Sequence, residues 1–449
     1  MSVAAPLSKS IATTIRGIPS KNIPASIQSV PTIAVIVTAM LFLGVFAQEA
    51  ALVYQHVMYR ALEATPDVTY RGAILLTPLA VLICFTLGDH PCMKLPQGFG
   101  LMIGLFLVSS VMSVAMSSIM CLETKYLIGD SLRFVGPWLT LFISYQSFRV
   151  IRQHAGTGAL IVWYDRLAYL AIFDALVTIG FGQAFFGWHI SNWFYIFLVG
   201  WVILSERHSD LTTNFLIAVV LYATAVSQKR TNFVIVFVAL ILAVFLRILY
   251  GRHIFRLCLT IAGLLLAALL AQAALTYFTG QESLIDVYVR IFQGISVIVI
   301  EGEVDNSYGY RINEVLNIQS FFSQSPWKLG FGVGFGGEIP MLYDTGPQAA
   351  TSHGNMHHAH KGYWIYLLRN GCCGLLLLAT FAWQASVGLI KSRSSAPLIT
   401  ASCAVYAVTR LVGSFGGNLM LEDFDLPLVV GLGFAFVDFD SLPAGGRSA

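Results

Sequence analysis

The chain has 449 residues, of which 57% are hydrophobic and 11% are charged, and its formal net charge is +3. Soluble globular domains use roughly 25% charged residues, so this composition excludes an ordinary water-soluble protein and indicates a protein that folds in lipid. The net charge is too small to imply a nucleic-acid partner, and the basic residues are scattered with no single run, so we expect no such partner.

The N-terminal region carries Lys9, Arg16 and Lys21 ahead of an apolar stretch that begins at Pro31. This pattern fits a cytoplasmic tail followed by a first membrane span, and it also fits a cleaved signal peptide. Because many spans follow and need no separate export signal, we interpret residues 1–30 as a cytoplasmic N-terminal tail and the first span as uncleaved.

Apolar stretches of the length that crosses a bilayer as helix continue to Asp438, and they lack the alternating pattern of barrel strands. The predicted fold class is therefore an all-α polytopic membrane protein with one large periplasmic loop. We predict about twelve transmembrane helices, of roughly 17–25 residues each. They lie near residues 31–48, 72–88, 98–120, 126–148, 159–181, 184–204, 211–227, 231–250, 254–279, 362–390, 396–414 and 421–438.

The short connections between these spans carry the basic residues expected of cytoplasmic loops, for example Lys94, Arg149, Arg207 and Lys391. This orientation predicts transmembrane helices 1–9 within residues 31–279, a periplasmic loop at 280–361, helices 10–12 within 362–438 and a cytoplasmic tail at 439–449. No internal repeat of the kind found in many transporters is visible.

The periplasmic loop has its own predicted elements. Glu282–Ile300 resembles an amphipathic helix at the membrane surface, and Tyr308–Phe322 has a second helical pattern. A glycine-rich turn follows at Gly330–Gly337, and a polar stretch rich in histidine runs from Thr345 to His360.

Three arginines lie on the predicted external side against the charge bias: Arg230, Arg311 and Arg410. A guanidinium near the membrane surface suits bidentate binding of phosphate oxygens, and the alternative is interfacial snorkelling of a long side chain. Arg369 differs, because it lies nine residues after His360 and so on the opposite helix face. An intramembrane charge is a functional hypothesis, and pairing with an acidic residue of another helix is the alternative.

Four histidines cluster ahead of the tenth span: His353, His357, His358 and His360. Their spacing permits a metal site, but no carboxylate is near in the sequence, so we expect no metal and no cofactor. His360 opens a helix, where the positive end of the helix dipole favours a neutral imidazole that can accept a proton. We interpret His360 as a general base and the other three as surface histidines of a polar loop.

The pairs Asp423-Phe424-Asp425 and Asp438-Phe439-Asp440 have the spacing of metal-binding acidic pairs in soluble sugar transferases. Both lie at the ends of predicted membrane spans without a nucleotide-binding domain, so we reject that interpretation.

The tenth span begins His360-Lys361-Gly362-Tyr363-Trp364, and Gly371 and Gly374 follow on the same helix. With the glycine-rich turn before it, this pattern resembles the O-antigen ligase and polysaccharide polymerase family, in which a histidine opens a helix carrying two glycines. Ser227–Thr231 is similar to the family's Ser-x-Arg break and aligns Arg230, and Arg311 matches the arginine that opens the helix of the external loop. The resemblance covers roughly residues 200–390.

The resemblance implies a GT-C-like architecture in the bacterial inner membrane and a metal-independent, inverting glycosyl transfer from an undecaprenyl-diphosphate-linked glycan donor. His360 would act as the base, and Arg230 and Arg311 would stabilise the diphosphate leaving group, with Arg410 as a weaker third candidate. Lys361 replaces the family's usual asparagine and could add a phosphate contact. The implied partners are a lipid-linked or lipid A core acceptor, membrane lipids, and a flippase and chain-length regulator of the same pathway.

Several functions stay open. The His-Lys-Gly-Tyr motif favours a polymerase that joins lipid-linked repeat units into exopolysaccharide or O-antigen, and the alternative within the family is an O-antigen ligase that transfers the glycan to lipid A core. A polysaccharide or lipid transporter is an alternative of another class, because Arg133, Asp174 and Arg369 could line a substrate path. A membrane scaffold without enzymatic activity is the third.

Overall fold

The computed structural model describes residues 98–121, 123–184, 194–205, 210–227, 230–250, 263, 306–345, 354–359, 362–392, 394–414 and 425–437. The expected spans at 31–48, 72–88 and 254–279 lie outside this part of the chain, apart from residue 263. The expected surface helix at 282–300 lies outside it as well.

Three helical segments among the described residues are long and apolar enough to cross a bilayer: Phe99–Met120, Thr231–Leu249 and Gly362–Lys391. They correspond to helix α4 (Phe99–Met120), to helix α8 (Arg230–Leu249), and to α13 (Gly362–Trp383) with its continuation through a π-helical turn into α14 (Leu389–Lys391). Apolar side chains such as Leu101, Val111 and Ile119 stay exposed on α4. Exposed apolar helix faces of this length fit contact with lipid.

The spans expected at 126–148 and 159–181 form one element, α5 (Thr124–Ala184). The element contains a break at Gly156, whose φ of 79° interrupts the helical backbone, and this break lies within the connection expected between the two spans. Arg149 and Arg152, which were expected in the connection, lie in the helical part before the break. A glycine adopts this left-handed conformation without steric cost, so the chain changes direction with few non-helical residues.

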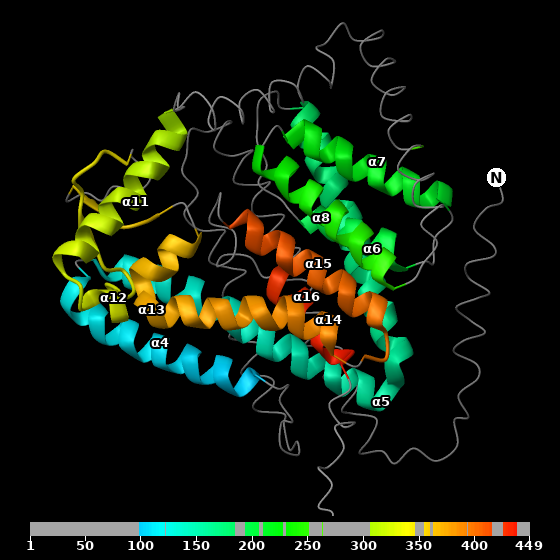
Figure 1. Cartoon of the computed structure of the whole chain (residues 1–449), viewed down its shortest axis with the longest axis horizontal. Coiled ribbons are helices and arrows are strands. Elements are labelled where there is room, and N and C mark those ends of the chain that lie inside the picture. Colours follow the sequence, from blue (N-terminus) through cyan, green and yellow to red (C-terminus); the bar gives the residue numbers. More distant parts are fainter. Residues whose placement is uncertain are drawn as a thin grey trace, which may run out of the picture.

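Shorter apolar helices complete the bundle: η1 (Phe194–Ile196) with α6 (Phe197–Ser205), α7 (Asp210–Ser227) and α16 (Asp425–Ala435) pack on α5, and α15 (Pro397–Gly413) packs on α6, α8 and α16. The span expected at 184–204 is therefore described as helix only from residue 194. In Figure 1, α15 and α16 lie between α6 with α8 on one side and α5 on the other. The Tyr406 ring packs edge-to-face against Phe194 and Phe197 in this core.

A smaller unit covers one end of α4 and α13. It comprises α11 (Asn306–Gln324), α12 (Lys328–Phe331) and the antiparallel strands β1 (Ile339–Pro340) and β2 (Asn355–Met356), and Figure 1 shows it at the left. The helix expected at 308–322 and the glycine-rich turn are confirmed as α11 and the segment after α12. The unit has its own apolar core, formed by Ile318, Phe322, Val333, Ile339, Met356, Ala359 and Leu368.

Candidate functional site

Helix α13 is broken at Gly371, where φ is 60° and ψ is −151°. Figure 1 shows its two limbs meeting at an angle beside α12. The break frees the carbonyls of Leu368 and Arg369 from the usual acceptance of the N–H four residues ahead. The N–H groups of Val333 and Gly334 donate to these two carbonyls instead, at 2.7 Å and 3.0 Å. The glycine-rich segment therefore docks on the broken helix through backbone hydrogen bonds.

The glycines of this segment are required by close packing as well as by conformation. Gly332, Gly334 and Gly336 have φ values of 76°, 80° and 69°. A Cβ at Gly332 would lie 2.5 Å from the backbone of Arg369, and one at Gly334 would lie 2.4 Å from the carbonyl oxygen of Ser113 on α4. The segment is thus wedged between α13 and α4, with no room for any side chain at these glycines.

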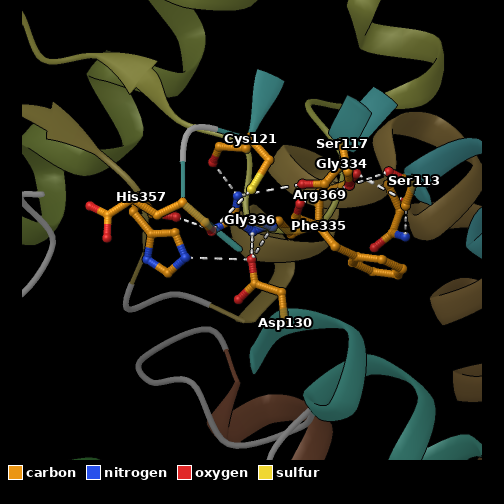
Figure 2. A network of polar contacts seen from close by, with 12 residues as sticks. Ser113, Ser117, Cys121, Asp130, Gly334, Phe335, Gly336, His357 and Arg369 are labelled. Carbon is orange, nitrogen blue, oxygen red and sulfur yellow. Dashed lines mark hydrogen bonds and ion pairs between the residues drawn. The ribbon is translucent and has the colours of Figure 1, made fainter. Parts of the chain in front are cut away.

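Two serines of helix α4 bind the segment and the broken helix, Ser117 the glycine-rich segment and Ser113 helix α13. The Ser117 hydroxyl donates to the carbonyl of Phe335 at 2.7 Å. The Ser113 hydroxyl donates to the carbonyl of Arg369 at 3.2 Å, and the side-chain amide of Asn370 donates to Ser113 Oγ at 2.6 Å. Figure 2 shows these contacts as one continuous polar network. Polar pairing of this kind satisfies backbone groups that would otherwise be buried without partners.

The centre of the network is an ion pair between two helices. Arg369 of α13 and Asp130 of α5 are both buried, and their Nε and Oδ2 atoms lie 2.8 Å apart. The pairing of Arg369 with an acidic residue of another helix is therefore confirmed. The same Oδ2 atom accepts a hydrogen bond from the backbone N–H of Gly336 at 2.7 Å.

The guanidinium of Arg369 also binds backbone carbonyls of the glycine-rich segment and of the chain after β2. Nη1 donates to the carbonyls of Gly334 and Gly337, and Nη2 donates to the carbonyl of His357. A planar guanidinium with five donors can make such a divergent set of bonds, which an ammonium group cannot reproduce. One side chain thus ties together α13, the glycine-rich segment and the chain that leads from β2 towards residue 360.

His357 lies next to this pair, not on the surface of a polar loop, so that expectation is wrong for His357. Its side chain is 13% exposed, its Nε2 atom lies 3.5 Å from Asp130 Oδ2, and its ring stacks on Tyr126 with 4.0 Å between the ring centroids. Burial lowers the pKa of His357 below its usual value, and the positive charges of Arg369 and Arg133 act in the same direction. The hydrogen bond and charge of Asp130 oppose this shift in part.

Two asparagines one helical turn apart fix the loop beyond β1. The side chain of Asn317 accepts hydrogen bonds from the backbone N–H groups of Leu342 and Tyr343, and its amide donates to the Tyr343 carbonyl, all within 2.9 Å. Asn313 donates to the carbonyl of Asp344 at 2.7 Å. Helix α11 thereby holds the loop by its backbone, without depending on the identity of the loop's side chains.

The structure describes only some of the predicted site residues. His360 and Lys361 lie outside the described residues, as does the side chain of Arg230, whose backbone begins α8. Arg311 lies in the first turns of α11 and is partly exposed. Their roles in catalysis and diphosphate binding stay predictions.

Arg410 lies in the core of α15 and is only 1% exposed. Its Nη2 atom is 3.5 Å from Oδ1 of Asp425, the first residue of α16, and the Tyr406 hydroxyl donates to the same carboxylate. One turn beyond Arg410, the carbonyl of Ser414 accepts the N–H of Gly362 at 3.1 Å. The end of α15 and the start of α13, two residues after His360, are therefore in direct contact.

Asp130 and His357 were not among the residues that the sequence singled out for function. Asp130 is a carboxylate inside an expected span, which is a signal of function or pairing in its own right. His357 was considered only as a metal ligand or a surface residue, because no carboxylate is near it in the sequence. The carboxylate that it contacts lies more than two hundred positions away.

Residues 215–379 match the model of a protein family described as O-Antigen ligase. No curated protein matches the chain, and no solved structure does. The matched range contains Arg230, Arg311, His360, Gly371 and the glycine-rich segment, and it ends before Arg410. The helices and their apolar faces agree with a membrane protein, and the family match over residues 215–379 confirms the resemblance to the O-antigen ligase, Wzy-type family that the sequence shows there.

Proposed function

We propose that this protein is a polymerase that joins undecaprenyl-diphosphate-linked oligosaccharide repeat units into exopolysaccharide or O-antigen at the periplasmic face of the inner membrane. The reaction is a metal-independent, inverting glycosyl transfer. Its donor is a lipid-linked glycan, and its acceptor is a second lipid-linked glycan.

The chemistry needs a base and a site for the leaving group. A sugar hydroxyl is a poor nucleophile at neutral pH, so His360 takes its proton as the hydroxyl attacks the anomeric carbon. The lipid diphosphate leaves with concentrated negative charge, which Arg230, Arg311 and Lys361 stabilise. Arg410 is the weaker candidate, because a carboxylate already lies beside it.

One observation carries this proposal. The family match covers the segment from Arg230 to His360 and the two glycines that follow, and within that segment the glycine-rich turn docks on the break at Gly371. The docked turn and Arg369 hold the chain that leads into residue 360, since the carbonyl of His357 is bound by Arg369. A base must stay within hydrogen-bond reach of its proton, and a fixed approach to α13 supports that requirement.

An O-antigen ligase is the second candidate, and the description of the matched family favours it. A ligase uses the same donor and the same base but passes the finished glycan to lipid A core.

Glycan analysis of a deletion strain separates the two. Single repeat units on the lipid carrier, with no polymer, support the polymerase. Long chains on the lipid carrier, with lipid A left bare, support the ligase. Normal polymer on normal lipid A contradicts both.

We expect His360→Ala to reduce glycan joining at least about a hundredfold, because general-base contributions are typically that large. Arg230→Ala and Arg311→Ala should impair it strongly. His154→Ala is the matched control, since His154 is an exposed histidine in the helix of α5. Full activity of the His360 variant, with the protein present in the membrane, would exclude the role of His360 as base.

A further inference from the structure

We propose that His357 is a further residue of the glycan-transfer site, where its Nδ1 atom accepts a hydrogen bond from a sugar hydroxyl, and that Asp130 is the residue that positions it. This inference rests on the proposed function, since it assumes a glycan substrate. It concerns a histidine that the resemblance to the family leaves without a role.

The carboxylate beside His357 determines which ring nitrogen can accept a hydrogen bond. Nε2 lies 3.5 Å from Asp130 Oδ2, and an ionised carboxylate only accepts hydrogen bonds. The charge of Asp130 therefore favours the neutral form of the ring with its hydrogen on Nε2, in which Nδ1 carries the lone pair that can accept. Figure 2 shows the second ring nitrogen directed away from Asp130 and Arg369.

The ring is held from several sides. Tyr126 of α5 stacks on it with an interplanar angle of 30°, and the backbone carbonyl of His357 is bound by Arg369. The preceding residue, Met356, pairs with Ile339 across the two strands. Residues that bind substrate groups work best when their own position is fixed by such neighbours. Helix, strand and aromatic contacts together give His357 that rigidity.

Among the described residues, the charged and titratable groups around the ring are Asp130, Arg133 and Tyr126 of α5, Arg369 of α13, and the adjacent His358, whose ring stacks on that of His357 with 6.2 Å between the centroids. Burial and the two arginines lower the pKa of His357, which keeps the imidazole neutral at neutral pH. A neutral ring with an acceptor nitrogen suits a sugar hydroxyl, which has a hydrogen to donate. It does not suit the diphosphate, which carries only acceptor oxygens.

Three substitutions separate the possible roles of the side chain. His357→Asn keeps an acceptor near the position of Nδ1, His357→Gln keeps a donor near the position of Nε2, and His357→Phe keeps a ring that stacks on Tyr126. His154→Gln is the matched control, because His154 is an exposed histidine of α5. Each full-length variant is expressed in the deletion strain and quantified in the membrane fraction.

The rate of glycan joining is measured in membrane vesicles that contain the strain's own lipid-linked glycans. We expect the Phe and Gln variants to lose about tenfold to a hundredfold in rate, the size of one lost substrate hydrogen bond. The Asn variant should retain a clearly larger share, and His154→Gln should match the wild type. Asp130→Asn should resemble the Phe variant in rate, because its amide would present a donor to Nε2 and leave Nδ1 protonated.

A purely structural His357 gives the opposite order. If the Phe or Gln variant is as active as the wild type, or more active than the Asn variant, stacking or the contact with Asp130 is the whole role and the inference is overturned. Loss in His360→Ala with full activity in all His357 variants would overturn this inference and leave the proposed function standing. Normal glycans in the deletion strain would contradict both the proposed function and this inference.

Discussion

At the scale of single residues, the Oδ2 atom of Asp130 is the point where three segments meet. It receives Arg369 Nε, the N–H of Gly336 and the Nε2 side of His357. A buried ion pair adds little when intact, but removing one partner leaves an uncompensated charge and costs about 3–5 kcal/mol. We therefore expect Arg369→Met to lower the free energy of unfolding by that amount and to reduce the amount of folded protein in the membrane.

Thermal unfolding of the purified protein in detergent tests this expectation. The double variant Asp130→Asn with Arg369→Met is the informative control, because it removes both charges together. The decrease in the free energy of unfolding of the double variant should be smaller than the sum of the decreases of the two single variants. Additive losses would mean that the pair is not energetically coupled.

His357 gives a pH dependence whose sign follows from its surroundings. Its pKa is lowered in the folded protein, chiefly by burial, so the unfolded chain binds more protons in the pH range between the two values. The stability that the neutral His357 permits is then fully present above the pKa of the unfolded chain, about 6.5, and is lost as the pH falls below that pKa. The unfolding temperature of the wild type should fall more steeply between pH 6.5 and pH 5 than that of His357→Phe. Parallel curves for the two proteins would contradict a lowered pKa.

The sequence predicted part of this network. An unpaired guanidinium inside a membrane span has a high free-energy cost, so an acidic partner for Arg369 could be predicted from the sequence. The identity of that partner was not, because several acidic residues lie in spans and only packing selects among them. His357 was misjudged for the same reason, since its burial depends on contacts with α5 and α13 and not on its polar neighbours in the sequence.

At the scale of elements, the break in α13 controls how the glycine-rich segment docks. Gly371 has a positive φ, and a Cβ there would lie 2.5 Å from the backbone nitrogen of Phe331. We expect Gly371→Ala to cost more than about 2 kcal/mol, from the disfavoured backbone conformation and the clash together. Helix α13 would straighten or the segment after α12 would detach, and glycan joining would be lost with it.

Limited proteolysis of the loop around residues 332–345 measures this detachment. Gly330→Ala is the matched control, because a Cβ at Gly330 has no neighbour within 4 Å and its backbone needs no positive φ. The control should keep the wild-type cleavage rate. Equal protection of the Gly371 and Gly330 variants would show that the break does not depend on glycine.

Hydropathy predicted the elements whose bounds depend on apolar length. The expected spans at 98–120, 231–250 and 362–390 lie within a few residues of α4, α8 and the run from α13 to α14. The gap that it left between the spans 126–148 and 159–181 contains the break at Gly156, although the helix extends through Arg149 and Arg152 before that break. It gave no sign of the break at Gly371, since a glycine in an apolar helix serves equally for close packing.

At the scale of the whole molecule, the polar contacts at the C-terminal end of α16 are separate from those that bind the unit of α11, α12 and the two strands. Arg152 donates to the carbonyls of Ala435 and Val437, and Ser395 donates to the carbonyl of Phe436. The carbonyls at the end of α16 are therefore bound by side chains from α5 and from the residues just before α15. The unit of α11, α12 and the two strands lies at the other end of α4, where the backbone of Glu338 binds Met120.

Because the two groups of contacts are separate, the predicted orientation in the membrane can be tested by labelling one residue near each of them. The end with Arg152 and Lys391 carries the basic residues of the expected cytoplasmic connections, whereas α11 belongs to the expected periplasmic loop. In a cysteine-free background, Ser323→Cys on exposed α11 should react with a membrane-impermeant maleimide in spheroplasts, and Ser395→Cys should react only after permeabilisation. Both positions are exposed, so a difference in labelling reports the side of the membrane and not burial. The reverse pattern would place the glycine-rich segment in the cytoplasm, away from a periplasmic lipid-linked donor, and would contradict the proposed function as well as the orientation.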